Sequence, residues 1–198
     1  MRSSVIKKGT WLASFMLAVC LCAHAEVKLP AIFSDGMVMQ QQTKANLWGT
    51  ATPNKKITVT TGWNGKQYVA TADKNGAWKL SVSTPEAGGP YSITFNDGSK
   101  KTLNNILIGE LWLCSGQSNM EMPMKGFKNQ PVENANMDIL RSKNPNIRLF
   151  TVKRTSTITP QNDVVGSWKE LDLYIAPMTD TEKEIVKAGC LINFNRNR

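Results

Sequence analysis

Residues 106–114 read Ile-Leu-Ile-Gly-Glu-Leu-Trp-Leu-Cys, a nearly continuous apolar run in a chain of 198 residues. Such a run is typical of a strand buried on both faces of a parallel sheet, because neither face needs polar side chains. It leads into Ser115–Met120, and a segment with helical spacing (132–142) and a β-prone segment (147–152) follow. This order of strand, loop, helix and strand predicts that an α/β unit begins at residue 106.

The sequence before this run has a different pattern. Short β-prone segments alternate with turn signals about every 8–12 residues, as in β-sandwiches. Ile57–Thr61, Trp78–Val82 and Tyr91–Phe95 alternate apolar and polar residues, which places one face of each strand on a core. Asn75-Gly76 is a hairpin turn signal, because both residues accept a positive φ. We therefore predict a β-sandwich of the immunoglobulin or jelly-roll kind for residues 26–105.

The first 25 residues have the features of a cleavable secretory signal. Arg2, Lys7 and Lys8 provide a basic start, residues 11–23 are apolar, and Ala23-His24-Ala25 is a small-x-small cleavage pattern. We expect cleavage after Ala25 and a secreted or periplasmic product. No apolar run reaches the roughly 20 residues that span a bilayer, so we expect no membrane span in the mature chain.

Removal of the signal takes away three basic residues and His24, the single histidine of the sequence. The formal net charge falls from +9 to +6, and the remaining lysine pairs, such as Lys55-Lys56 and Lys100-Lys101, are scattered. A nucleic-acid partner is not expected, because nucleic-acid binders have a clustered basic face. Residues 26–198 contain no histidine, so they cannot complete a Ser-His-Asp set or a His-ligated metal site.

Ser118 lies in the segment Gly116-Gln117-Ser118-Asn119-Met120, between the apolar run and the helical segment. A turn at the end of a buried strand exposes a hydroxyl and directs backbone N–H groups toward the same space, where they can stabilise an oxyanion. The nucleophile elbow G-x-S-x-G has a second glycine where this chain has Met120. On spacing alone, an ordinary loop therefore remains the alternative.

Two longer stretches resemble a known family. Residues 109–123, Gly-Glu-Leu-Trp-Leu-Cys-Ser-Gly-Gln-Ser-Asn-Met-Glu-Met-Pro, resemble the nucleophile block of the sialate O-acetylesterases, which are SGNH-like carbohydrate esterases. Residues 29–40, Leu-Pro-Ala-Ile-Phe-Ser-Asp-Gly-Met-Val-Met-Gln, and Leu47-Trp48-Gly49 are similar to the opening of the same family. The resemblance extends from Val27 to Trp168, so the chain is similar to the N-terminal portion of these enzymes.

The resemblance implies a fold and a site. The sandwich precedes the start of an SGNH-hydrolase-like, flavodoxin-like α/β domain over residues 106–170, which is incomplete here. Ser118 matches the nucleophile that attacks an O-acetyl group of a sialic acid or related glycan, and its own N–H is an oxyanion donor. Gly116, Gln117 and Asn119 shape the same loop. The chemistry needs no cofactor and no metal.

Neighbouring residues keep more than one interpretation. Glu121 suits a role in the site or a place at a helix N-terminus, where the helix dipole favours a carboxylate. We expect Trp112 and Met120 to pack in a core rather than to contact substrate, and Cys114 to be an inert thiol in the buried strand. A bridge between Cys114 and Cys190 is left open.

The chain also departs from the family. The family takes its histidine base from a later block that has no counterpart here, and residues 171–198 form an atypical tail. We therefore expect an inactive fragment of a longer esterase, ended by truncation or a frameshift. The alternative is a non-catalytic, carbohydrate-binding sandwich that uses Trp63 or Trp78 as an aromatic face for a sugar, although packing in the core is open for both tryptophans.

Overall fold

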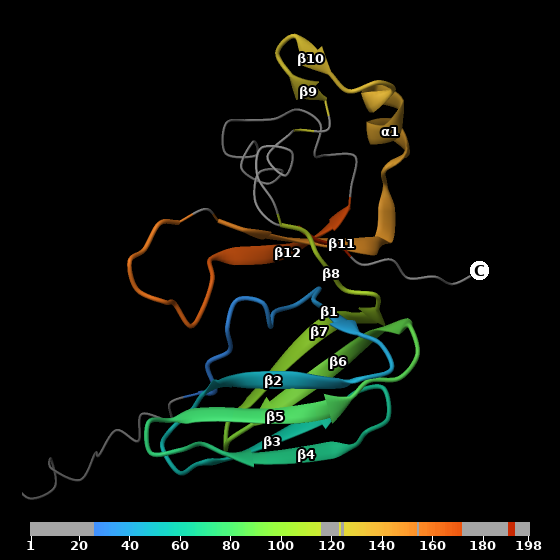
Figure 1. The fold of residues 1–198 in the computed structure, drawn as a ribbon. Helices are drawn as coiled ribbons and strands as arrows, with labels where there is room; N and C mark the ends of the chain where they lie inside the picture. The colour runs from blue at the N-terminus through green and yellow to red at the C-terminus, as the bar shows by residue number, and fades with distance from the viewer. Residues whose placement is uncertain (1–25, 116–122, 124, 154, 172–189, 193–198) are drawn as a thin grey trace, which may run out of the picture.

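The computed structural model (Figure 1) describes residues 26–115, 123, 125–153, 155–171 and 190–192. Seven strands form its N-terminal part. They are β1 (Val38–Gln40), β2 (Lys44–Thr50), β3 (Lys56–Thr61), β4 (Gln67–Thr71), β5 (Ala77–Ser83), β6 (Gly88–Asn96) and β7 (Lys100–Gly109). One sheet has the order β1-β7-β6-β3-β4 and the other pairs β2 with β5. Figure 1 shows β2 and β5 in front of the larger sheet, so the predicted β-sandwich is present.

The period-two alternation of the sequence places the core between these sheets. In β3, Ile57 and Val59 are fully buried, as are Ile93 and Phe95 in β6. The indole of Trp78 in β5 lies 5.9 Å from the ring of Phe95, measured between ring centroids. The two sheets therefore meet through side chains that alternate with exposed polar residues, as expected for a half-buried strand.

The predicted turn at Asn75-Gly76 connects β4 to β5. A carboxylate oxygen of Asp73 accepts hydrogen bonds from the N–H groups of Asn75 and Ala77, at 2.7 and 2.9 Å. Gly76 has φ +83°, and a Cβ at this position would collide with the carbonyl oxygen of Ala51. This turn therefore requires glycine for both its backbone conformation and its close contact.

The apolar run 106–114 does not form one strand. Ile106, Leu107 and Ile108 are buried as predicted, but they complete β7, which pairs antiparallel with β6 and parallel with β1. The chain leaves the sandwich after Gly109, and Trp112–Leu113 forms the separate strand β8. The expectation of a single strand inside a parallel α/β sheet was therefore wrong, because the sandwich itself supplies the burial that the apolar residues require.

The second part of the structure contains a small sheet, a hairpin and a short helix. Its elements are β8, β9 (Gly126–Phe127), β10 (Gln130–Pro131), α1 (Ala135–Arg141), β11 (Asn144–Val152), β12 (Gly166–Leu171) and β13 (Cys190–Ile192). The sheet order is β12-β11-β13-β8, and every pairing described in it is antiparallel. The helix and the strand predicted at 132–142 and 147–152 are present as α1 and β11. The described strands of this sheet do not form the predicted parallel arrangement, because β12 returns after the loop 153–165 and pairs antiparallel with β11.

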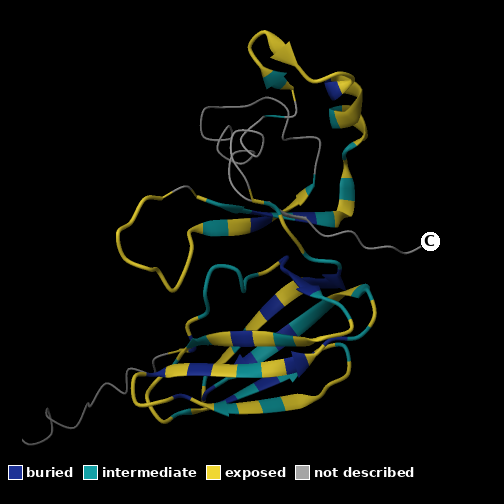
Figure 2. Cartoon of the chain, viewed as in Figure 1, coloured by how far each residue is buried: buried dark blue, intermediate teal, exposed yellow. Residues whose placement is uncertain are grey.

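The hairpin of β11 and β12 shares the core of the sandwich. Phe150 and Trp168 belong to the same buried cluster as the residues between the two sheets, and their ring centroids lie 5.2 Å apart. The Trp168 indole N–H donates to the carbonyl of Ile32 at 2.8 Å. Figure 2 shows the buried segments of this hairpin next to the exposed loop that joins its strands.

A buried arginine makes a second connection at this junction. The Arg148 guanidinium lies 3.0 Å from a carboxylate oxygen of Glu170 and donates to the Asn105 side-chain oxygen at 3.1 Å. The Arg148 side chain is almost fully buried, and its third nitrogen, Nε, donates to the Pro145 carbonyl. The cation is therefore surrounded by acceptors, as a buried charge requires. In the part of the chain that the structure describes, no helix is long and apolar enough to cross a membrane.

Candidate functional site

The serine segment lies between two described stretches of the chain. Gly116, Gln117, Ser118 and Asn119 lie outside the described residues, together with Met120 and Glu121. The structure describes the chain up to Ser115 and again at Pro123. The described segment that leads to the serine runs from the end of β7 through β8.

Two glutamines hold the start of this segment. Glu110 follows β7 directly, and its carboxylate accepts hydrogen bonds from the Gln40 amide at 3.1 Å and from the Gln41 amide at 2.6 Å. The Gln40 side-chain oxygen accepts the N–H of Leu111 at 2.8 Å. The Gln41 backbone N–H also donates to the Gly109 carbonyl at 2.8 Å. The end of β1 therefore fixes the three residues at which the chain leaves the sandwich.

These hydrogen bonds also affect the acidity of Glu110. The Gln41 amide, and secondly the Gln40 amide, donates to the ionised carboxylate and lowers the pKa of Glu110 below its ordinary value of 4.5, against a smaller opposing effect of burial. Hydrogen bonds to the charged form favour that form. Glu110 is therefore an anion at neutral pH, placed between the sandwich and β8.

β8 lies at the edge of the small sheet and faces solvent. Trp112 and Leu113 are 58% and 81% exposed, and their backbones pair with Ile192 and Leu191 of β13. The expectation that Trp112 packs in a core was therefore wrong, because the apolar run leaves the sandwich before this residue. Cys114 is half-buried with a free thiol, and it follows β8 rather than lying in a buried strand.

The tryptophans considered as sugar platforms take different positions. Trp78 is only 4% exposed and packs in the sandwich core, which leaves no face for a ligand. Trp63 is half-buried; its indole N–H donates to the Ser83 carbonyl at 3.1 Å and its ring meets Tyr91 edge-on. Core packing therefore accounts for Trp78, and Trp63 is held by its neighbours.

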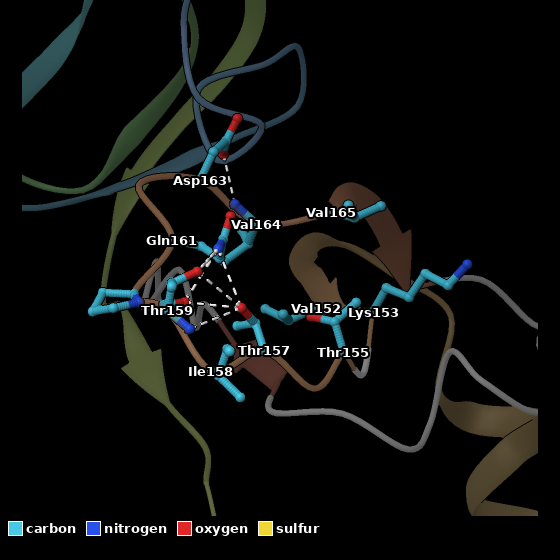
Figure 3. Close-up of a pocket in the computed structure, with 11 residues that line it drawn as sticks. Val152, Lys153, Thr155, Thr157, Ile158, Thr159, Gln161, Asp163, Val164 and Val165 are labelled. Carbon is cyan, nitrogen blue, oxygen red and sulfur yellow. Dashed lines mark hydrogen bonds between the residues drawn. The ribbon is translucent and has the colours of Figure 1, made fainter.

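The loop between β11 and β12 forms an open hollow of about 730 Å³ (Figure 3). Thr157, Thr159 and Gln161 hydrogen-bond to one another across it. An Asp163 carboxylate oxygen accepts from the N–H groups of Ala31 and Val164. The hydrogen bonds of these four residues therefore hold the loop together and attach it to the N-terminal segment.

Within the described ranges, no group of three or more His, Cys, Asp or Glu side chains is placed to hold a metal ion. The structure does bring Glu110 together with Gln40 and Gln41, and Glu110 precedes the serine segment in the sequence. None of these three residues was predicted from the sequence to have a role. The sequence did offer a clue to them. Each lies within or directly beside residues 29–40 or 109–123, the two stretches that resemble the sialate O-acetylesterases.

Comparisons with known proteins find acetylesterases. No protein-family model matches the chain. The chain is 26% identical over 149 residues to the sialate O-acetylesterase of Pongo abelii, covering 70% of this chain and 28% of that protein. It is 26% identical over 175 residues to the sialate O-acetylesterase of Rattus norvegicus, covering 82% of this chain and 32% of that protein.

A solved structure is also similar. A carbohydrate acetylesterase from Xanthomonas citri superposes with a TM-score of 0.67 at 29% identity, covering 75% of this chain and 33% of that one. The fold and these likenesses define the class as proteins related to carbohydrate acetylesterases. The chain is similar in sequence to sialate O-acetylesterases and in fold to a carbohydrate acetylesterase. It spans about a third or less of the length of the relatives that it matches.

Proposed function

We propose that this chain provides the sandwich and the nucleophile segment of a serine esterase that removes O-acetyl groups from sialic acids or related glycans. Ser118 is the proposed nucleophile. Its hydroxyl oxygen attacks the acetyl carbonyl carbon, its proton passes to a base, and the carbonyl oxygen becomes an oxyanion. The sugar hydroxyl then leaves, and water releases acetate from the serine in the second half of the reaction.

The observation that supports this proposal most strongly is the context of residues 109–123. Their sequence resembles the nucleophile block of that family, and the proteins to which the chain is similar are named as acetylesterases. The described part of this block leaves the sandwich through a segment held by Gln40, Gln41 and Glu110. A nucleophile benefits from such a rigid support, because catalytic geometry has to be maintained within a fraction of an ångström.

The polypeptide of residues 26–198 contains no histidine, and we propose that it does not hydrolyse acetyl esters by itself. A serine hydroxyl without an adjacent general base is a weak nucleophile at neutral pH. The base would have to be supplied by sequence outside these residues. Export to the periplasm or the exterior, with cleavage after Ala25, is part of the same proposal.

Two assays test this function. Purified 26–198 and its Ser118→Ala variant are compared on 4-nitrophenyl acetate and on O-acetylated sialic acid, and both should match the buffer rate. Hydrolysis that requires Ser118 would refute the proposed inactivity and would support the nucleophile assignment. The second assay joins residues 26–168 to the remaining sequence of a family member; this chimera should hydrolyse both esters, and its Ser118→Ala variant should not. A folded chimera that stays active after Ser118→Ala would refute the nucleophile assignment.

A glycan-binding sandwich without catalysis is less well supported. Trp78 is buried in the core, and Trp63 is half-buried with its ring against Tyr91 and its indole N–H bonded to the Ser83 carbonyl. Titration of 26–198 with acetylated and de-acetylated sialosides would detect such binding.

A further inference from the structure

The hydrogen bonds around Glu110 have a fixed direction. The Gln40 side-chain oxygen is occupied by the N–H of Leu111, and the Gln41 side-chain oxygen is occupied by the N–H of Ala87, both at 2.8 Å. A backbone N–H can only donate, so each amide is oriented with its oxygen toward the backbone. Both NH₂ groups must then point at residue 110.

This orientation determines which side chain fits at position 110. Two donors converge on it, one at each carboxylate oxygen. An ionised carboxylate accepts at both oxygens, whereas a glutamine of the same shape has one acceptor and one competing donor. The arrangement therefore requires a side chain at residue 110 that only accepts hydrogen bonds. A side chain of the same length and shape that also donates does not satisfy it.

We propose that Glu110 is a positioning residue for the esterase site: with Gln40 and Gln41 it forms a clamp that fixes the path of the chain from β7 into β8 and so the start of the serine segment. The catalytic purpose of the clamp depends on the proposed function of Ser118. The clamp itself does not, because it concerns only the path of residues 109–113. It makes the sandwich a support for the site rather than a separate binding module.

The clamp acts on the backbone through Leu111. The Leu111 N–H donates to Gln40 while Gln40 donates to Glu110, so two consecutive residues of the exit segment share one side-chain amide. The carbonyl of Gly109, the residue before them, accepts the N–H of Gln41. Three consecutive residues are thereby attached to the end of β1, and β8 begins one residue later.

The donor and acceptor pattern predicts a specific rescue. Glu110→Gln alone places an NH₂ group against a second NH₂ group, and Gln40→Glu alone places two carboxylates against each other. The double variant Gln40→Glu with Glu110→Gln restores the pattern. One oxygen of the new carboxylate at position 40 accepts from Leu111, the other accepts from the new amide at position 110, and the oxygen of that amide accepts from Gln41. A role that depended only on the size or charge of residue 110 would not produce this rescue.

Cys114 provides a reporter three residues beyond Leu111. In the 26–198 chain with Cys190→Ser it is the remaining thiol, and it is half-buried. The rate of labelling by 5,5′-dithiobis-(2-nitrobenzoate) then measures how well the exit segment is held. We expect each single variant to be labelled about tenfold faster, the change that follows from losing one hydrogen bond to a charged group, and the double variant to return to within a factor of about two.

Glu86→Gln is the matched control. Glu86 is an exposed glutamate that accepts a 3.4 Å hydrogen bond from the neighbouring Gln42, so the same chemical change occurs outside the clamp. Its labelling rate should stay unchanged. Amide exchange at Leu111 provides a second measurement of the same segment, and thermal unfolding verifies that each variant is folded.

Equal labelling of the single variants and the parent, or a double variant that stays as fast as the singles, would overturn the clamp. Neither result would affect the proposed function, which is tested separately by hydrolysis with and without Ser118. Conversely, a failed esterase assay together with a successful rescue would leave the clamp intact and remove only its catalytic purpose.

Discussion

Phe150→Ala should destabilise the sandwich and the β11–β12 hairpin together. The Phe150 ring is fully buried, lies 5.2 Å from the Trp168 ring between centroids, and belongs to the same buried cluster as the sandwich core. It also fills the space beside Gly166, where a Cβ would approach the ring to 2.7 Å. The residue therefore lies where the hairpin attaches to the first part of the fold.

The structure gives the size of the effect. A buried phenylalanine removes on the order of 150–250 Å² of surface from water, much of it from the ring. At about 25 cal/mol per Å², loss of roughly 120 Å² with the ring costs about 3 kcal/mol. The cavity and the lost pair with Trp168 add on the order of 1 kcal/mol. We therefore expect the free energy of unfolding to fall by about 4 kcal/mol, within the usual range for this substitution.

The assay is urea unfolding of 26–198, followed by far-UV circular dichroism and by tryptophan fluorescence. Both signals should shift together to lower urea, because hairpin and sandwich share one core and unfold as one unit. Phe127→Ala is the matched control: Phe127 is 41% exposed in β9, so its loss should cost less than about 1 kcal/mol.

Two results would refute this reasoning. One is a Phe150→Ala chain whose unfolding free energy stays within about 0.5 kcal/mol of the parent, which is typical of a surface substitution. The other is a parent chain whose two signals give separate transitions, since the hairpin would then unfold independently of the sandwich.

Three further outcomes are expected. Gly76→Ala should lower the free energy of unfolding by about 1–3 kcal/mol because of its positive φ and the contact with Ala51, and thermal melts measure this. Arg148→Ala should cost more than Glu170→Ala, about 3 against about 1 kcal/mol in urea unfolding, because it removes a buried side chain together with its hydrogen bonds to Asn105 and Pro145, both of which the guanidinium keeps when the half-exposed Glu170 is lost. The lowered pKa of Glu110 means that its stabilising contribution is complete above the ordinary value of 4.5 and is lost as pH falls through the lower folded value. The acid-induced drop in melting temperature should therefore be smaller in Glu110→Gln than in the parent, and an identical drop would contradict this assignment.

Local sequence patterns predicted the sandwich well. The alternation at Ile57 and Val59 set which face of β3 is buried, and Asn75-Gly76 set the hairpin between β4 and β5. Both signals act over a few residues, because strand pleating and turn conformation are local properties of the backbone. The helix and the strand after residue 130 were also found close to their predicted positions, as α1 and β11.

The candidate site was predictable only in part. The wording around Ser118 led to the family, and the comparisons support that family. The clamp was not predicted, because Gln40 and Gln41 lie about seventy positions from Glu110 and no local pattern connects them. Trp112 was placed in a core for the related reason that an apolar run does not reveal where the chain leaves a sheet.

The sequence by itself determined the alternation of the sandwich strands, the turn at Gly76, the resemblance to sialate O-acetylesterases and the absence of histidine from residues 26–198. Only the tertiary structure decided that Ile106–Ile108 complete the sandwich and that Trp112 faces solvent. The physical reason is that burial depends on which strands lie beside a segment. β1 and β6 pair with the first half of the apolar run, and the carboxylate of Glu110, hydrogen-bonded to the end of β1, marks the point at which that pairing ends.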